Sequence, residues 1–294
     1  MYDVVECLPT EFFQFSYLAH SEPGAVILSV EPGRRHGCTP PMLTVIQNLI
    51  VVAATVLGSL LFMAGLNRVW PSEKRRPHND VIGWQLGILG TTYAVILGFM
   101  LYAVWTSFGE AELNVDLEAN AVVDINRLAD ALPEPQRTQL QTLAHSYTDA
   151  VIKQEWPQMA KGEVPEKSTA INEAMWKTVI SVKPALPAEV NAQRHAMSEL
   201  SSLAQHRLTR VLQSTTQLPG VLWCVLVVGG SLTIVSACTF GTESVKLQAL
   251  QVFFLSLLIS LSLAAISDIH RPFHGLIHVS DYAFRTAQQS MQAQ

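Results

Sequence analysis

An uncharged stretch of 29 residues, from Val81 to Gly109, constrains this chain more than any other feature, because it contains no Asp, Glu, Lys or Arg. About 20 apolar residues are enough for a helix to cross a bilayer. A cluster of acidic residues follows at once: Glu110, Glu112, Asp116 and Glu118. No proline interrupts the chain from there until Pro133. The sequence therefore predicts one helix that crosses a membrane over 81–108 and continues into water as far as Leu132.

Three further apolar segments of similar length occur, at about 43–66, 218–240 and 247–267. The mean hydropathy is +0.25 and only 15% of the residues are charged, against about 25% in soluble domains. Of the chain's 43 charged residues, 24 lie within 110–210. The sequence therefore predicts an all-α integral membrane protein with four transmembrane helices arranged two plus two (42–108 and 218–267). An all-helical soluble domain over 109–217 is inserted between the second and third helices.

The soluble region shows helical periodicity and no strand-like alternation. Four helices are predicted, at about 110–132, 135–156, 169–182 and 187–217. In the first, we expect the apolar face to contain Leu113, Leu117, Ala121, Ile125, Leu128 and Leu132. In the last, we expect it to contain Val190, Met197, Leu200, Ala204, Leu208 and Val211. A tail, 268–294, follows the fourth membrane helix, with one or two weakly amphipathic turns at its end.

Residues 1–41 follow neither pattern. Acidic residues stand where a signal peptide would be basic, and the apolar runs are short. We predict a disordered or weakly ordered extension. The alternative is that the native chain starts at Met42, directly before the first membrane helix.

Two rows of residues on the second membrane helix are candidate functional surfaces. A small-residue row lets helices approach closely and favours assembly with further copies of the chain: Gly83, Gly87, Gly90, Ala94 and Gly98. A second stripe could line a central pore, with its apolar members forming a constriction that gates by dewetting: Thr92, Ile96, Phe99, Ala103 and Thr106. The alternative for this stripe is ordinary helix packing or lipid contact.

The acidic cluster at the membrane edge has two interpretations. It could form a cation site or an electrostatic vestibule. The alternative is a solvated helix face, on which Arg127 pairs with Asp124 or Asp130.

The tail carries three histidines, His270, His274 and His278, and the motif residues Arg271, Pro272, Phe273 and Gly275. Pro272 and Gly275 disfavour the regular helix that would bring the histidines onto one face, so no metal site is predicted. We expect a turn that docks Phe273 under the second pair of membrane helices. Arg271 would then bind a lipid phosphate or a carboxylate.

Sequence motifs for enzymes are missing: there is no P-loop, HExxH, G-x-S-x-G or dinucleotide fingerprint. The four cysteines show no zinc spacing. The net charge of −5 gives no reason to expect nucleic acid as a partner. The predicted membrane segments lack ionisable Asp, Glu, Lys, Arg and His, which argues against a proton relay or an ion-coupled transporter. The sequence predicts a protein that is not an enzyme and needs no cofactor.

Several short stretches resemble the bestrophin-like domain family of bacterial and plant membrane proteins. They include His78-Asn79-Asp80, Phe108–Glu112, Leu132–Pro135, Glu155-Trp156-Pro157, Leu218-Pro219 and Arg271–Gly275. The resemblance covers about 42–286, and His270 departs from it where an Asp is expected. It implies a homo-oligomeric anion channel, passing ions such as chloride through a pore around the second membrane helix. The alternative is a non-conducting scaffold or sensor whose helical domain binds a protein partner.

The expected location is the plasma (inner) membrane, which the chain crosses several times. The loop 67–80 is rich in basic residues, and the positive-inside rule places such a loop in the cytoplasm. That puts the soluble domain on the other side. The resemblance to bestrophins implies the opposite orientation, with the soluble domain in the cytoplasm.

Overall fold

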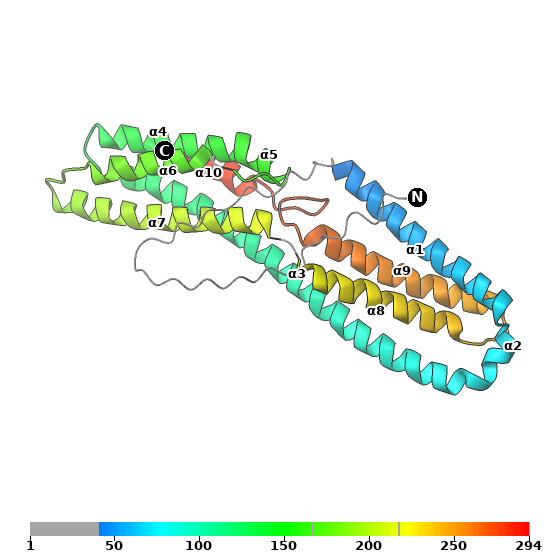
Figure 1. The fold of residues 1–294 in the computed structure, drawn as a ribbon. Helices are drawn as coiled ribbons and strands as arrows, with labels where there is room; N and C mark the ends of the chain where they lie inside the picture. The colour runs from blue at the N-terminus through cyan, green and yellow to red at the C-terminus, as the bar shows by residue number, and fades with distance from the viewer. Residues whose placement is uncertain (1–40, 166, 217, 294) are drawn as a thin grey trace, which may run out of the picture.

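The computed structural model describes residues 41–165, 167–216 and 218–293, and every regular element in these ranges is a helix. This confirms the all-helical prediction for the described part of the chain. The prediction for residues 1–41 falls outside it, apart from Pro41, which begins the first helix. The molecule is elongated, with one set of helices at each end and one long helix, α3, running through both (Figure 1).

Among the described residues, four helices are long and apolar enough to cross a membrane. They are α1 (Pro41–Val69), the first part of α3 (Asn79–Ala129), α8 (Gly220–Thr239) and α9 (Val245–Ile269). Two short elements, α2 (Ser72–Arg75) and a 3₁₀ turn, η1 (Arg76–His78), connect α1 to α3. The four helices lie side by side in one bundle (Figure 1).

Helix α3 is continuous over 51 residues, as its lack of proline predicts. It ends at Ala129, three residues earlier than expected. The proline at 133 disfavours helical geometry at the residue before it, so the chain leaves the helix just ahead of this point. The same helix therefore supplies a wall of the membrane bundle and the central element of the soluble half.

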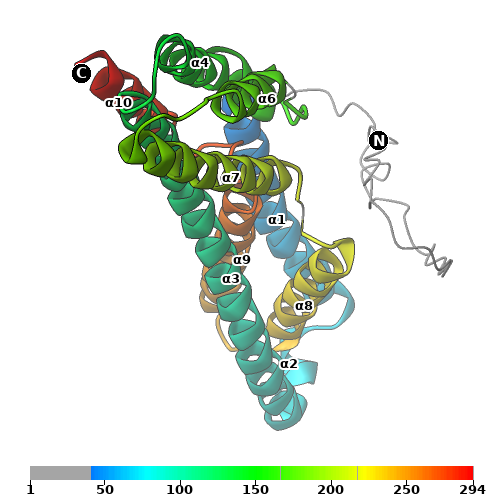
Figure 2. The same cartoon turned by 90° about the vertical axis from the view of Figure 1, so that its left-hand side faces the viewer.

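The soluble half packs five helical segments around the C-terminal part of α3 (Figure 2). They are α4 (Gln136–Ala150), a π-helical turn η2 (Val151–Glu155) continuing into α5 (Trp156–Met159), α6 (Lys167–Ile180), α7 (Pro187–Thr215) and α10 (Tyr282–Gln292). At the end of the tail the sequence predicts only one or two weakly amphipathic turns, but the structure has a longer helix there. Helix α10 has 11 residues, and Phe284, Ala287 and Met291 bury one face of it against α3 and α4.

A buried arginine closes the far end of the membrane bundle. Arg75 is fully buried, and its Nη1 donates to the backbone carbonyl of Cys238, 2.6 Å away, at the end of α8. A guanidinium suits this position because the last carbonyls of a helix lack intrahelical donors and carry partial negative charge. Asn79 adds two bonds to the backbone of Gly241, at 2.7 and 2.9 Å. The basic loop thus ties the first pair of membrane helices to the second.

Inside the bundle, α3 meets α8 at Tyr93. The Tyr93 hydroxyl donates to the Leu226 carbonyl over 3.0 Å, and its ring lies against Gly229 and Gly230. A Cβ atom at Gly229 would approach the ring to 2.7 Å. Close contact between these helices therefore depends on glycines of α8 rather than on the small-residue row of α3.

Candidate functional site

The predicted pore stripe lies on the side of α3 that the subunit leaves largely uncovered. Thr92, Phe99, Ala103 and Thr106 are exposed, and Phe99 keeps 70% of its surface. Ile96 differs, because it is half-buried and packs against the core. Four of the five candidates thus share an open face, and Ile96 lies at its edge.

The small-residue row of α3 is also mostly open. A Cβ atom at Gly83 would meet the Phe240 ring at 3.5 Å, whereas Gly87, Gly90 and Gly98 have no neighbour within 4 Å of that position. Ala94 is exposed. Apart from Gly83, the row therefore makes no close helix contact with the part of the subunit that the structure describes, and its role in assembly stays a prediction.

The structure separates the four carboxylates of the acidic cluster. Glu110, Glu112 and Asp116 are exposed, but Glu118 is fully buried. The solvated-face interpretation thus fits three of the four, and the predicted pairing of Arg127 with Asp124 is present at 3.4 Å on the surface. For Glu118 the solvated-face interpretation is wrong, because this side chain is fully buried.

Glu118 and Arg210 form a buried ion pair between α3 and α7. Arg210 donates from Nε to Glu118 Oε2 over 2.6 Å and from Nη2 to Glu118 Oε1 over 2.9 Å, and neither side chain is exposed. Tyr147 of α4 donates its hydroxyl to Glu118 Oε1 over 2.7 Å. This bidentate geometry is the strongest form of arginine–carboxylate pairing.

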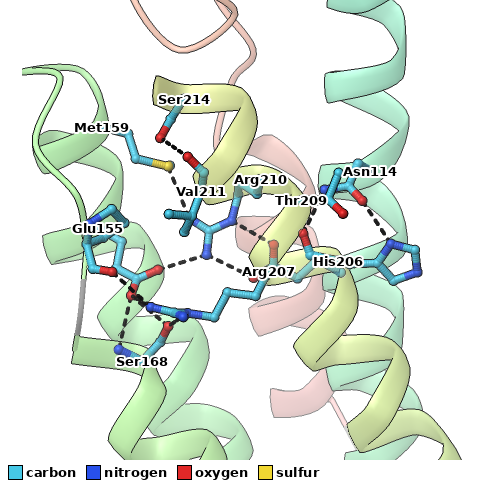
Figure 3. Close-up of polar contacts among 12 residues, drawn as sticks. Asn114, Glu155, Met159, Ser168, His206, Arg207, Thr209, Arg210, Val211 and Ser214 are labelled. Atoms are coloured by element: carbon cyan, nitrogen blue, oxygen red, sulfur yellow. Dashed lines mark hydrogen bonds and ion pairs between the residues drawn. The ribbon is translucent and has the colours of Figure 1, made fainter. Parts of the chain in front are cut away.

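Glu155 extends the pair into a four-charge network. Arg210 Nη2 donates to Glu155 Oε2 over 2.8 Å, and Arg207 Nη2 donates to Glu155 Oε1 over 3.1 Å (Figure 3). Ser168 gives Glu155 two more hydrogen bonds, from its backbone N–H at 3.0 Å and its hydroxyl at 2.6 Å. Two carboxylates balance two guanidinium groups, which is the condition for burying charge at tolerable cost.

Aromatic and sulfur groups enclose the Arg210 guanidinium. Its Cζ lies 5.8 Å from the Trp156 ring centroid and 5.9 Å from that of Phe284, within cation–π range. Met159 Sδ lies 3.2 Å from Nη1. Beside the network, Asn114 and His206 join α3 to α7: Asn114 donates to the His206 carbonyl at 2.8 Å, and the His206 ring nitrogen lies 2.9 Å from Asn114 Oδ1 (Figure 3).

The π-helical turn η2 ends at the residue that joins the network. Such turns insert one residue into a helix, change which side chains point inward, and are frequent at functional sites. Here the last residue of the turn, Glu155, is fully buried and directed at α7. The local backbone irregularity and the buried carboxylate thus occur together.

Burial and the neighbouring groups shift the pKa values of Glu155, Arg210 and Tyr147. Burial would raise the pKa of Glu155, but Arg210, the Ser168 hydrogen bond and Arg207 outweigh burial and lower it to about 2. Burial would lower the pKa of Arg210, but the Glu118 carboxylate raises it above its ordinary value. Burial and the neighbouring Glu118 raise the pKa of Tyr147 well above 10. Glu155 and Arg210 are therefore charged, and Tyr147 is neutral.

The motif of the tail forms a turn. Phe273 is buried and meets the Trp156 ring edge-on, with centroids 5.7 Å apart, in a core cluster that also contains Ile266 and Ile269 at the end of α9. Its docking under the membrane helices stays a prediction. Pro272 is buried beside Phe273. Arg271 is exposed, and its predicted binding of a phosphate or carboxylate stays a prediction. Gly275 has φ +108°, a conformation that glycine adopts readily.

The three tail histidines do not converge. The His270 ring packs edge-on against Trp223 at 5.8 Å, His274 Nδ1 lies 2.7 Å from the Ala160 carbonyl, and His278 is exposed. Burial, with Arg271 nearby, lowers the pKa of His270. Among the described residues, no group of three or more His, Cys, Asp or Glu is placed to hold a metal ion.

Known proteins give this geometry a context. A model of the bestrophin-like domain matches residues 53–284, which is most of the chain. The chain belongs to the bestrophin-like domain family. This confirms the resemblance drawn from the sequence motifs. Among curated protein sequences, none matches this chain.

Solved structures agree on the fold. Two structures of a bacterial bestrophin homologue from Klebsiella pneumoniae, each carrying one substitution, superpose with TM-scores of 0.63. They are 13% and 14% identical to this chain and cover 84% of it, and the match spans 98% and 99% of their own lengths. A third, described only as a membrane protein, gives a TM-score of 0.57 at 13% identity, with 84% and 98% covered. The chain therefore has a bestrophin-like fold and is a membrane protein.

Proposed function

We propose that this chain is one subunit of a homo-oligomeric anion channel in the plasma (inner) membrane, with several α3 helices surrounding a central pore. In this arrangement α1 and the first part of α3 cross the bilayer as one pair and α8 and α9 as the other. The helical domain over 109–217 lies outside it. The bestrophin kinship supports conduction rather than an enzymatic role.

One observation carries the proposal. Helix α3 packs one face against α8, while its opposite face, with Thr92, Phe99, Ala103 and Thr106, is left uncovered by the described residues of its own subunit. Threonine hydroxyls can donate hydrogen bonds to a passing anion. Phe99 is the bulkiest side chain of the stripe, and a ring of such side chains forms an apolar constriction. The open small-residue row beside it suits close contact between neighbouring α3 helices.

Subunit number is the first test. A pore walled by one helix from each subunit needs several copies around one axis, so the detergent-corrected mass of the purified protein should be a multiple of 32.3 kDa. A monomer would remove the central pore and leave the scaffold or sensor alternative in front.

Chloride flux from liposomes is the second test. Phe99→Ala should raise the flux, because it widens the constriction, whereas Phe62→Ala should leave it unchanged. Phe62 is a matched control because it is an exposed phenylalanine of the membrane bundle, 47% exposed, but belongs to α1. Flux that is absent in the wild type, or equally altered by both substitutions, contradicts the pore assignment.

A further inference from the structure

Two large apolar side chains stand next to each other on the surface of the loop between α9 and α10. Leu276 is 61% exposed and Ile277 is 43% exposed. The residues that fix the loop on either side, Phe273 and Val279, are buried in a hydrophobic core that contains residues of the soluble half and of the end of α9. The loop therefore directs its apolar side chains inward at its base and outward at its tip.

The tip is held rigidly in this conformation. Asp268 accepts a hydrogen bond from the Leu276 backbone N–H at its Oδ1 and from the Ile277 backbone N–H at its Oδ2, both over 2.9 Å. Gly275 permits the turn through its φ of +108°, and a Cβ there would lie 2.6 Å from Asp268 Oδ1. At the base, the Val279 N–H donates to the Pro272 carbonyl over 2.7 Å. These hydrogen bonds thus fix Leu276 and Ile277 in exposed positions.

The same contacts fix where the tip lies. Asp268 belongs to the last turn of α9, a candidate membrane helix that ends at Ile269. The hydrogen bonds to Asp268 bring the tip of the loop back to the level at which α9 leaves the bilayer. Figure 1 shows this loop between the end of α9 and the soluble half. Arg271 and His278, which flank the tip in sequence, are both exposed.

We propose that residues 275–278 form an interfacial anchor loop, which inserts Leu276 and Ile277 into the headgroup region of the bilayer that α9 crosses. Apolar side chains next to basic ones suit this region, where the hydrocarbon boundary meets lipid phosphates. Arg271 is placed to contact a phosphate while its aliphatic stem stays at the apolar boundary. The anchor fixes the soluble half against the membrane surface, and it does so whether or not the protein conducts ions.

A fluorescent label reports this contact directly. The full-length chain, with its own cysteines replaced, is given a single cysteine by Ile277→Cys, labelled with an environment-sensitive nitrobenzoxadiazole and reconstituted into phosphatidylcholine–phosphatidylglycerol liposomes. Leu186→Cys is the matched control. Leu186 is 59% exposed and directly precedes α7. The N-terminal end of α7 lies at the end of the soluble half away from the membrane helices (Figure 1).

The proposal predicts blue-shifted emission from the label at 277 and quenching by a lipid nitroxide placed near the headgroups. The label at 186 should be quenched by aqueous iodide instead. A 277 label that iodide quenches as fully as the 186 label overturns the proposal. So does a label protected from both quenchers, since protein would then cover the tip, either another copy or residues of the same chain. Leu276→Cys, labelled in the same way, gives a second measurement if the first variant fails to fold.

Discussion

Neutralising Glu118 should destabilise the soluble half more than any change on its surface. In Glu118→Gln, the side chain loses its negative charge, and the amide group that replaces one carboxylate oxygen donates toward Arg210 instead of accepting from it. The wild-type carboxylate accepts at 2.6 and 2.9 Å from Arg210 and at 2.7 Å from Tyr147 in a fully buried position. Removing one partner of such a pair leaves an uncompensated charge and costs about 3–5 kcal/mol.

Hydrogen exchange is the suitable assay, because a protein with membrane and soluble parts does not unfold in one two-state step. If exchange follows opening of the soluble half, a cost of about 3–5 kcal/mol makes the amides of α7 exchange roughly 10²–10⁴-fold faster. Glu112→Gln is the matched control: it makes the same change at an exposed position of the same helix. Equal exchange in the two variants would refute the reasoning that the Glu118–Arg210 pair holds α3 to α7.

Two further predictions concern acid and the tail loop. The pKa of Glu155 is about 2 in the folded protein against about 4.3 in an unfolded chain, so the unfolded chain binds the extra proton and about 3 kcal/mol of stability is lost as the pH falls from about 5 to about 2. Glu155→Gln should be less stable at neutral pH, but the opening free energy of its soluble half, measured by hydrogen exchange, should change less with pH over that range; an unchanged slope would contradict the assignment. Gly275→Ala should lower the opening free energy measured in the same way by at least about 1–3 kcal/mol through its strained φ alone, and by more because its Cβ displaces the Asp268 carboxylate. Gly162→Ala is the control, since its φ is +70° but open space surrounds its Cβ position; equal losses in the two variants would remove the role given to Asp268.

The membrane helices could be predicted from sequence because length and the absence of charge are local properties. The expected spans differ from α1, α8 and α9 by one to three residues at each end. The continuity of α3 likewise follows from the absence of proline. Helix α10 was underestimated because what stabilises it is tertiary: Phe284 is fully buried among elements that are distant in sequence.

The predicted apolar faces of α3 and α7 are only partly buried, and the mismatch hid the buried network. Ala121, Ile125 and Leu200 are buried as expected. Leu113, Leu117 and Leu208 are instead 58%, 42% and 58% exposed. The buried phase of α3 runs through Val104, Phe108, Ala111, Val115, Glu118, Val122 and Ile125. That of α7 runs through Ala192, Ala196, Leu200, Leu203 and Arg210. The buried face of α3 contains one acidic residue, Glu118, and the buried face of α7 contains one basic residue, Arg210. This pattern is visible in the sequence.

No sequence pattern of this kind predicts that Arg75 is buried. In sequence it is one of several basic residues of a short loop, and the positive-inside rule treats them alike. Only the approach of the α8 terminus, 163 residues away in the chain, makes it a buried cap for the Cys238 carbonyl. The role of Tyr93 is likewise not predictable from local sequence, because its hydroxyl donates to the Leu226 carbonyl, 133 residues away in the chain.

The two faces of α3 connect the soluble half to the proposed pore. Glu118 lies on the buried phase of the helix and Phe99 on the open stripe, roughly 28 Å apart along one uninterrupted helix at 1.5 Å per residue. The helix is continuous between these positions and contains neither a proline nor a π-turn, two common causes of a sharp kink. Tilting of α3 at the charge network therefore displaces the stripe in the membrane as well. The channel proposal thus assigns the buried network a mechanical role, because it sets the angle at which each subunit presents Phe99 to its neighbours. The scaffold alternative requires only that the network keep the domain folded.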